Sequence, residues 1–321
     1  MALPTDQSPT VADAEPGTTE ELTEPAVPRR IAAVDPIGAL MQPPTSRRSR
    51  GRLGFWLAAA WIGVVALAAV FADVLPLHDP NTFTDLGPRV SPGLGRMDEL
   101  LGTDVIGRSV TARLVYGARQ SLTIGVVAVS VAVVVGSTLG LVSGYFRGKL
   151  DEVINVVLDS VLAFPPLVLL LAVASIGQRS VTTLIAGLAV LGVAPFARLV
   201  RANTLSLADR EFVLAARSMG ASNLRIMFRE ILPNVIPSVV SIVVLFMATI
   251  IVAEGSLSFL GLGVPPPDPS WGSMVNEGRQ YLRDSPLLVF IPSAALLFTV
   301  MSLRRLGEQV QTRVARTRSN T

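Results

Sequence analysis

The chain has 321 residues, half of them hydrophobic, and its mean hydropathy of +0.54 is well above that of an ordinary soluble protein. This composition, with its long apolar runs, indicates an integral membrane protein. The absence of cysteine excludes a disulfide framework and a thiol nucleophile, and the single histidine, His78, excludes a paired-histidine zinc site. The formal net charge is only +3, but the basic residues are unevenly distributed along the chain.

Residues 1–50 are predicted to be a disordered tail, because prolines recur and no helical or strand period is sustained. A solvated tail is the expected role, and a docking role is the alternative. The first span is predicted at Leu53–Ala72, within residues 51–75, because this apolar run is long enough to cross a bilayer. A cleaved signal peptide is the competing interpretation, but a leader of about fifty residues before the apolar run is too long for one.

Residues 76–120 are polar and rich in glycine and proline, so they are predicted to lie outside the membrane core. The second span is predicted at Leu122–Val142. Glycine recurs there at every fourth residue, at Gly136, Gly140 and Gly144, and such a strip lets another helix approach closely in lipid. Helix packing is therefore the expected role of this strip, in preference to a ligand site.

The third span is predicted from about Val153 to Ile176. Pro165 and the proline that follows it remove backbone hydrogen bonds and should bend the helix. Asp159 is an acid inside this span, and such an acid usually faces a cavity or a basic partner. Arg198 lies near the corresponding end of the fourth predicted span, Thr182–Val200, so we expect an ion pair between Asp159 and Arg198. Direct contact of Asp159 with a transported substrate is the alternative.

Residues 203–235 follow the fourth span and are crowded with charge. They must lie in water, because each ionisable side chain at a bilayer centre costs about 2.5–3.5 kcal/mol. Two short amphipathic helices are predicted here. The first is expected to be capped at Ser206 and to end at Gly220, which can adopt a left-handed conformation without steric cost. The second is expected to be capped by Ser222 and to end at Pro233.

Each of these two helices should carry an apolar stripe. The stripes predicted from the spacing are Ala208, Phe212, Ala215 and Met219 on the first helix, and Leu224, Met227, Phe228 and Ile231 on the second. Such faces need something to bury them, which is either the chain's own spans or a groove on a separate protein.

The remaining predicted elements are a fifth span at Ile236–Ala253, an outer segment at 254–285, a sixth span at Pro286–Leu303 and a basic tail at 304–321. The predicted five-span core is therefore 121–303. With six spans, most basic residues fall on one side: Arg47, Arg48, Arg50, Arg52, Arg147, Lys149, Arg304, Arg305, Arg313, Arg316 and Arg318, together with those of residues 203–235. By the positive-inside rule both termini and residues 203–235 are cytoplasmic.

The chain cannot build the lysine-containing phosphate loop of an ATPase. Its only lysine, Lys149, is followed by Leu150 and does not fit the G-x-x-x-x-G-K-[ST] pattern. His78 lies in the polar segment 76–120 and is expected to be an ordinary exposed residue. The sequence therefore predicts no catalytic, cofactor-binding or metal-binding residue, and it predicts that the chain is not an ATPase by itself.

Three separated blocks resemble one family, and together they lie within the stretch from Leu53 to Arg305. They are LGTDVIGRSVTARLVYGARQSL before the second span, the run that contains Ala215, Ala216, Gly220, Leu232 and Pro233, and the outer segment beginning at Glu254 and continuing to Pro269-Ser270-Trp271-Gly272. These blocks resemble the C-type permease subunits of dipeptide, oligopeptide and nickel ABC importers. The second block resembles their coupling loop, known as the EAA motif, and we call residues 203–235 the coupling loop. Two positions depart from the motif: Leu214 replaces the acidic residue, and Glu230 replaces an isoleucine.

The resemblance implies an all-α membrane protein with six transmembrane helices, the type I importer permease fold. It implies three groups of functional residues. Those expected to contact the ATPase are Asp209, Glu211, Phe212, Ala215, Ala216, Arg217, Met219 and Gly220. Those expected on the translocation path or in an internal ion pair are Asp159, Arg198 and Pro165. Those expected at the outer gate or in contact with a binding protein are Asp104, Arg108, Phe259 and Trp271.

It also implies partners: a second homologous permease chain, ATP-binding subunits that hold ATP and magnesium, an external substrate-binding protein and membrane lipid, but no nucleic acid. The expected location is the inner membrane of a prokaryote, and the expected substrates are di- and oligopeptides. Nickel chelates or another small solute are the alternative within the family. An ion-coupled secondary transporter and a membrane scaffold are the alternatives outside it, but the sequence offers one internal acid and no convincing repeat for the former.

Overall fold

A computed structural model describes residues 50–95, 100–176 and 180–319, so the predictions for residues 1–49 lie outside the described residues. The helices are α2 (Arg50–Val70), α3 (Val110–Phe146), α4 (Gly148–Leu162), α5 (Pro166–Ile176), α6 (Val181–Ala208), α7 (Glu211–Ser218), α8 (Asn223–Arg225), the π-helical turn η2 (Ile226–Ile231), α9 (Leu232–Phe259), α10 (Trp271–Gly278), the 3-10 turn η3 (Arg279–Tyr281) and α11 (Leu287–Ser319). Among the described residues, five helices are long and apolar enough to cross a membrane, or six if α4 and α5 form one broken span. The predicted all-α membrane fold is confirmed.

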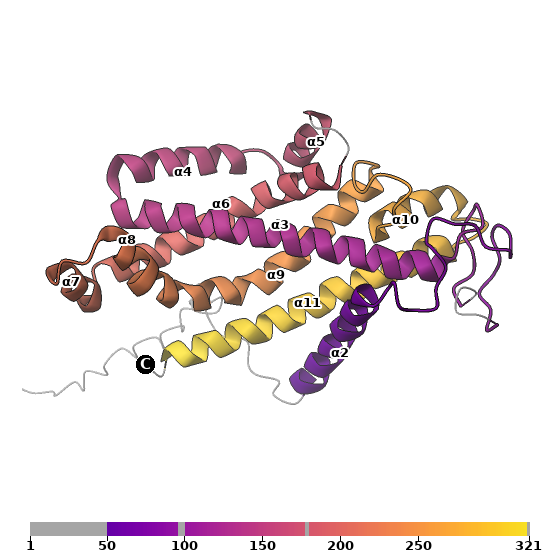
Figure 1. The fold of residues 1–321 in the computed structure, drawn as a ribbon, viewed down its shortest axis with the longest axis horizontal. Helices are drawn as coiled ribbons and strands as arrows, with labels where there is room; N and C mark the ends of the chain where they lie inside the picture. Colours follow the sequence, from indigo (N-terminus) through magenta and orange to yellow (C-terminus); the bar gives the residue numbers. More distant parts are fainter. Residues whose placement is uncertain (1–49, 96–99, 177–179, 320–321) are drawn as a thin grey trace, which may run out of the picture. The chain divides into compact units, whose positions relative to one another are not determined.

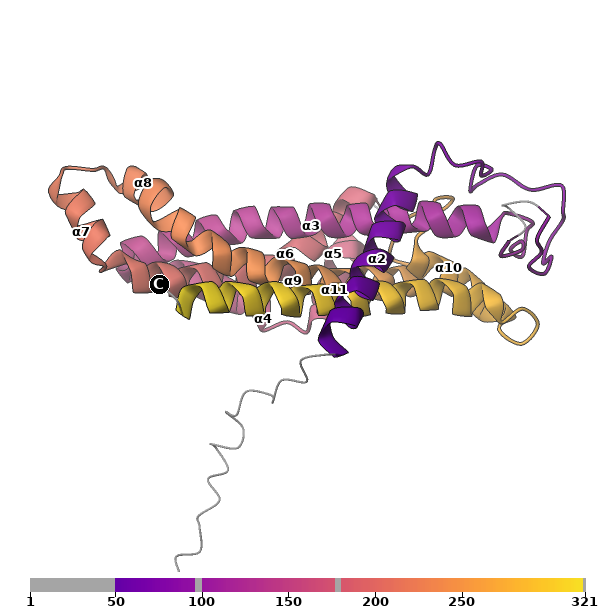
Figure 2. The same cartoon turned by 90° about the horizontal axis from the view of Figure 1, so that it is seen from below.

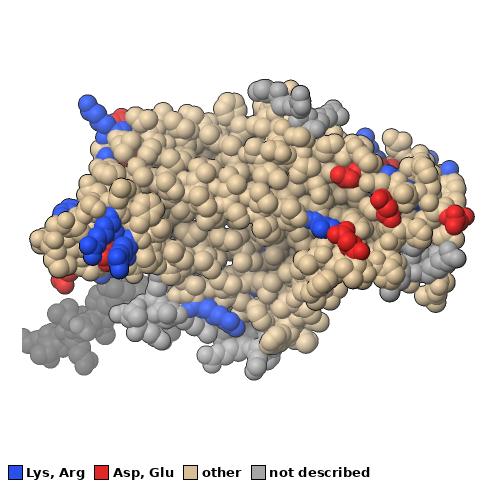
Figure 3. Space-filling view, in the orientation of Figure 1, with Lys and Arg blue, Asp and Glu red and all other residues tan. Residues whose placement is uncertain are grey.

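The long helices α3, α6, α9 and α11 lie side by side, and α2 crosses them at an inclination (Figures 1 and 2). The helices α7 and α8 lie at one end of this bundle, and α10 lies at the other end with the segment that precedes α3 (Figure 1). On the face shown in Figure 3, charged side chains gather toward both ends and leave a broad uncharged band between them. This distribution is the one expected of a bundle whose middle lies in lipid.

The glycine strip of α3 is where α6 packs. A Cβ atom added to Gly136 would lie 2.6 Å from the carbonyl oxygen of Val193, and one added to Gly140 would lie 2.3 Å from the carbonyl oxygen of Ala197. A Cβ atom added to Gly144 would lie 2.8 Å from Cβ of Thr204. No larger residue fits at such distances, so the glycines set the approach of the two backbones. The predicted packing role of the strip is confirmed.

The third span is broken rather than gently bent. α4 and α5 meet at an angle of 90° around residues 163–165. Pro166 is the first residue of α5, a position at which the backbone N–H has no partner within the helix, so its absence in proline costs nothing. The proline ring prevents α4 from continuing into α5 as one helix. The predicted bend at Pro165 and Pro166 is therefore confirmed.

Several helices extend well past the apolar runs that predicted them. α3 begins at Val110 instead of Leu122, and the hydroxyl of Ser109 caps it by accepting a hydrogen bond from the Ala112 N–H at 3.2 Å. α11 likewise continues through most of the predicted tail to Ser319. Hydropathy marks only the part of a helix that lies in lipid, so the polar ends of these helices could not be located by it.

Candidate functional site

The coupling loop forms two short helical pieces around a glycine corner. Gly220 has a φ of +78° with no atom within 4 Å of its would-be Cβ, as expected for the left-handed end of a helix. Ser222 caps the second piece by accepting a hydrogen bond from the Arg225 N–H at 3.4 Å. These two predictions are confirmed.

The outer limits of the two pieces differ from the prediction. Ser206 lies inside α6, which continues to Ala208, so the hydroxyl of Ser206 caps nothing and the first piece begins at Glu211. Pro233 does not end the second piece, because it lies in the first turn of α9, where proline is tolerated. α8, η2 and α9 thus follow one another without a loop, and the second piece is joined directly to the fifth span.

The buried face of α7 is not the predicted stripe. Val213 and Ala216 are buried, and they pack in one apolar cluster with Ile226, Met227 and Ile231 of the following pieces and with residues of α3, α6 and α9. The predicted Phe212, Ala215 and Met219 are exposed, as are Leu224 and Phe228. The stripe on α7 is thus left uncovered by this chain, which is one of the two outcomes that the sequence allowed, while Met227 and Ile231 of the second stripe are buried. Both faces of α7 are apolar, so periodicity could not tell which one meets the chain's own spans.

The exposed face of α7 is consequently apolar, with charged residues along its edges. Met219 is 80% exposed and lies next to the glycine corner, and Phe212 and Leu214 are also exposed. Asp209, Glu211 and Arg217 are exposed around them. An apolar surface rimmed by charge, on an element fixed to the bundle, is suited to contact another protein.

Polar contacts tie the coupling loop to the end of α3. The hydroxyl of Tyr145 donates to Oδ1 of Asn223 at 2.9 Å and accepts from Nη2 of Arg217 at 3.3 Å, and the Arg217 guanidinium lies 5.8 Å from the Tyr145 ring centroid. Nη2 of Arg147 lies 2.7 Å from Oδ2 of Asp209. Tyr145 was not identified from the sequence, because nothing in its spacing links it to residues so distant in the chain.

The predicted ion pair of Asp159 and Arg198 is confirmed. Nη2 of Arg198 donates to Oδ1 of Asp159, which joins α4 to α6. The Arg198 and Asp159 side chains are 53% and 61% exposed in this single chain. Charged side chains within a span are costly in lipid, so this face of α4 and α6 is expected to meet water or protein.

A second link between α4 and α6 was not predicted. Nε and Nη2 of Arg201 donate to the two oxygens of Asp151, each at 2.6 Å. Ser143 of α3 also donates to Asp151, and so does Nδ2 of Asn155, at 2.5 Å from Oδ1. A bidentate arginine–carboxylate pair with further donors is among the stronger polar contacts a protein makes. Asp151 therefore joins α3, α4 and α6 at the same end as the coupling loop.

At the opposite end, four charged residues form a cluster in which Asp104, Arg108 and Arg113 are buried and the Glu277 side chain is 36% exposed. Nε of Arg108 lies 2.6 Å from Oδ2 of Asp104, and Glu277 of α10 accepts from Nη2 of Arg108 at 2.7 Å and of Arg113 at 3.0 Å. Arg113 is 1% exposed. The cluster joins the segment before α3, α3 itself and α10.

The residues predicted at the outer gate or in contact with a binding protein differ in their burial. Asp104 and Arg108 are buried and paired, and Trp271 is buried with its Nε1 donating to the Leu114 carbonyl oxygen at 3.0 Å. These three side chains are enclosed by the chain, and their assignment to the outer gate stays a prediction. Phe259 is partly exposed and lies under the Arg279 guanidinium, 5.6 Å from its ring centroid.

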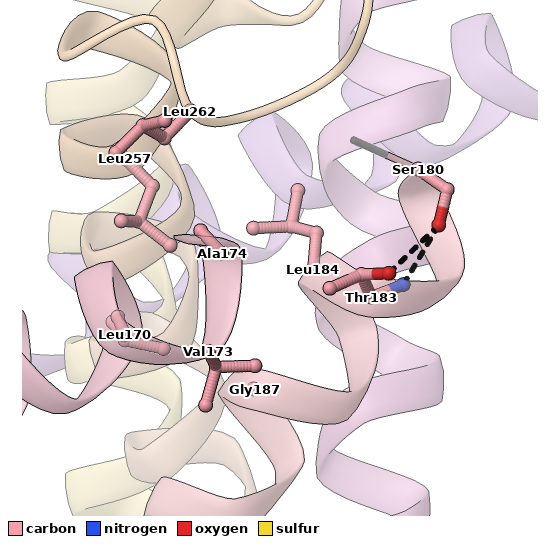
Figure 4. A pocket seen from close by; sticks show the side chains of 9 residues that line it. All are labelled: Leu170, Val173, Ala174, Ser180, Thr183, Leu184, Gly187, Leu257 and Leu262. Atoms are coloured by element: carbon pink, nitrogen blue, oxygen red, sulfur yellow. Dashed lines mark hydrogen bonds between the residues drawn. The ribbon is translucent and has the colours of Figure 1, made fainter. Parts of the chain in front are cut away.

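The described residues include cavities that do not resemble a substrate site. One, of about 20 Å³, lies among α5, α6 and the end of α9 (Figure 4). That is room for about one water. Its polar side chains are Ser180 and Thr183, which hydrogen bond to each other at the start of α6 and so serve as a helix cap. A larger groove of about 530 Å³, lined by Phe259 and Leu297 among others, is almost wholly apolar.

Comparison with known proteins identifies the family. Residues 136–316 match the family described as "Binding-protein-dependent transport system inner membrane component". The chain is 39% identical over 255 residues to the "Glutathione transport system permease protein GsiD" of Pectobacterium atrosepticum, covering 78% of this chain and 83% of that one. It is 35% identical over 242 residues to the "Dipeptide transport system permease protein DppC" of Alkalihalophilus pseudofirmus, covering 75% and 79%.

Among solved structures, an inward-facing form of the MetNI methionine ABC transporter matches with a TM-score of 0.52 and 20% identity, over 63% of this chain and 95% of that one. At this identity the match concerns the fold, and it agrees with the type I permease fold expected from the sequence. The chain therefore belongs to the family of inner membrane components of binding-protein-dependent transport systems, the transmembrane permease subunits of ABC importers.

Proposed function

We propose that this chain pairs with a second homologous permease chain to form the translocation path for di- and oligopeptides, which an external substrate-binding protein delivers. ATP and magnesium are bound and turned over on separate partner subunits. Both termini and the coupling loop face the cytoplasm, as the distribution of basic residues indicates. The observation that carries this proposal is the exposed apolar face of α7, which is held on the bundle by Val213 and Ala216.

The way in which α7 is attached to the bundle supports its proposed contact with the ATPase. Its buried face packs with residues of α3, α6 and α9, while Tyr145 and Arg147 tie its two ends to α3. A force applied to the exposed face would therefore reach several spans at once. Gly220 sets the corner between the two pieces, and Ala215 leaves room for a close approach on the exposed side. This is the arrangement expected of a lever that a partner ATPase grips.

The second permease chain is supported by the exposed ion pair of Asp159 and Arg198. Lipid would penalise a charged pair at this depth, and the exposure of the pair in one chain indicates that something polar covers it in the assembly. A water-filled path shared with a second chain satisfies this requirement. Asp159, Arg198 and the break at Pro165 would then lie on or beside that path.

Peptides are the proposed substrates because the relatives carry the names of dipeptide, glutathione and peptide transport systems. Nickel chelates or another small solute remain the alternative within the family. The ion-coupled secondary transporter and the scaffold both lose their basis, because the family is one of binding-protein-dependent transport systems.

The ATPase contact is tested by placing a charge on the exposed face of α7. Met219→Glu should reduce co-purification of the ATP-binding subunit with the detergent-solubilised chain, because a carboxylate would be buried in the interface. Leu94→Glu is the matched control, since Leu94 is also an exposed apolar residue but lies in the segment before α3. Equal ATPase recovery with both variants would contradict the proposed contact.

A further inference from the structure

Glu254 is a buried acid of α9 that the proposed function does not use. Its side chain is fully buried, and its hydrogen-bond partners are hydroxyl groups of α3 and α9. Ser121 of α3 donates to Oε2 at 3.1 Å and Ser258 of α9 donates to Oε1 at 2.7 Å, while Ser270, which caps α10, lies beside the same carboxyl group. A carboxyl group is costly to bury unless its oxygens are hydrogen bonded, so its position here depends on the surrounding helix ends being in place.

A second contact fixes the first turn of α10. A Cβ atom on Gly272 would lie 2.6 Å from the Gly255 carbonyl oxygen and 2.7 Å from Cβ of Ser258, so α10 touches the backbone of α9 directly. Trp271 is buried against α3, where it donates to the Leu114 carbonyl oxygen and where a Cβ on Gly117 would lie 3.4 Å from its ring.

A third contact fixes the last turn of α10. Glu277 lies there and accepts from Arg108 and from Arg113 of α3, and both arginines are buried while the Glu277 side chain is 36% exposed. α10 is thus held at both ends of its eight residues by contacts with buried polar groups. The polar contacts that hold the coupling loop differ in kind, because Arg147, Asp209 and Asn223 are exposed to solvent. Exposed pairs contribute little stability, whereas breaking a buried pair leaves an uncompensated charge.

We propose that Glu254 is a positioning residue that fastens α10 to α3 and α9, and that these three helix ends move as one body during transport. We call this set, Ser121, Glu254, Ser258, Ser270, Trp271 and Glu277, the outer clamp. The inference rests on the proposed function, because it assigns a mechanical role within a transport cycle. It requires that the outer end opens between this body and the partner permease chain and not by release of α10 from α3.

Cross-linking tests the single-body motion, and the absence of native cysteine makes introduced pairs unambiguous. Val110 of α3 and Met274 of α10 line the same small cavity but are outside the outer clamp, so the Val110→Cys/Met274→Cys pair can be joined with a short bis-thiol reagent. ATP-driven uptake by the joined protein should stay within about twofold of the reduced protein, which shows that the variant folds. Loss of uptake on joining, with recovery on reduction, would overturn the proposal.

The role of Glu254 is tested in the Met274→Cys single variant, where a maleimide reports exposure of the buried position on α10. Glu254→Ala should speed this labelling at least tenfold and raise the ATP hydrolysed per substrate imported, while Glu254→Gln should preserve both values, since an amide can still bond the hydroxyls. Unchanged labelling in Glu254→Ala would exclude the positioning role. Labelling needs no substrate, so its result can be interpreted even if the proposed substrate or transport activity is wrong.

Discussion

Gly220 is the residue on which the geometry of the coupling loop depends most directly. Its φ of +78° lies in a region that costs a residue with a side chain about 1–2 kcal/mol, while no atom lies within 4 Å of its would-be Cβ. A side chain therefore fits at this position, and the cost of a substitution arises from backbone conformation alone. A substitution at Gly220 thus changes the angle of the corner without changing the packing around it.

Gly220→Val should consequently alter the corner and uncouple ATP hydrolysis from uptake without unfolding the spans. Gly220→Asn is the matched variant, because asparagine tolerates the left-handed conformation and should retain most coupling. The measurement is ATP hydrolysed per substrate imported by the purified complex. Normal coupling in Gly220→Val would show that the corner is not part of the lever.

Asp159 and Arg198 form an ion pair that joins α4 to α6. Neutralising either residue leaves the other charged and unpaired within a span. The single variants Asp159→Asn and Arg198→Gln should therefore each lose more uptake than the double variant that carries both changes. A double-mutant cycle on uptake rates measures this coupling. Additive losses would mean that the two charges act independently, as they would if each contacted substrate.

At the scale of elements, the packing of α3 on α6 depends on glycine, and a matched glycine lies elsewhere in the chain. Gly140→Leu should lower the free energy of unfolding of the detergent-solubilised protein by about 1–3 kcal/mol, and with it the melting temperature. The reason is that Cβ of the leucine would collide with the Ala197 carbonyl oxygen. Gly63→Leu in α2 should have little effect, since no atom lies within 4 Å of that position. Equal melting temperatures of the two variants would contradict the close contact.

The elements also show what could be predicted from sequence. Long apolar runs, the glycine strip and the double proline each act locally, so the spans, their packing face and the break at Pro165 were predictable. The buried face of α7 was not predictable, because Val213 and Ala216 are buried by packing against residues of other helices. The same holds for Arg108, whose partner Glu277 lies on α10, and for Asp151, whose partner Arg201 lies on another helix.

At the scale of the whole molecule, the bundle has two different ends. The coupling loop is held by an apolar cluster and exposed polar contacts, while α10 is held by buried carboxyl, hydroxyl and guanidinium groups. Exposed polar contacts are the least costly to break. We therefore expect the polar contacts of the coupling loop to adjust, while its apolar cluster and the outer end remain assembled.

The predicted tail gives a prediction at the same scale. If residues 1–50 are only a solvated segment, deletion of residues 2–45 should leave uptake largely unchanged, because the spans and the coupling loop stay complete. Uptake by cells that carry the deleted chain, normalised to the amount in the membrane, measures this. Complete loss of uptake with normal membrane insertion would assign the tail a docking role.

If this chain is a permease subunit, it carries substrate only when partner subunits hydrolyse ATP. Peptide uptake into proteoliposomes is the decisive measurement, with the chain reconstituted either alone or with its partner permease, ATP-binding subunits and binding protein. We expect uptake by the full assembly that requires ATP and magnesium, and none by the chain alone under an ion gradient. Uptake by the chain alone, driven by the gradient without any ATPase, would contradict it.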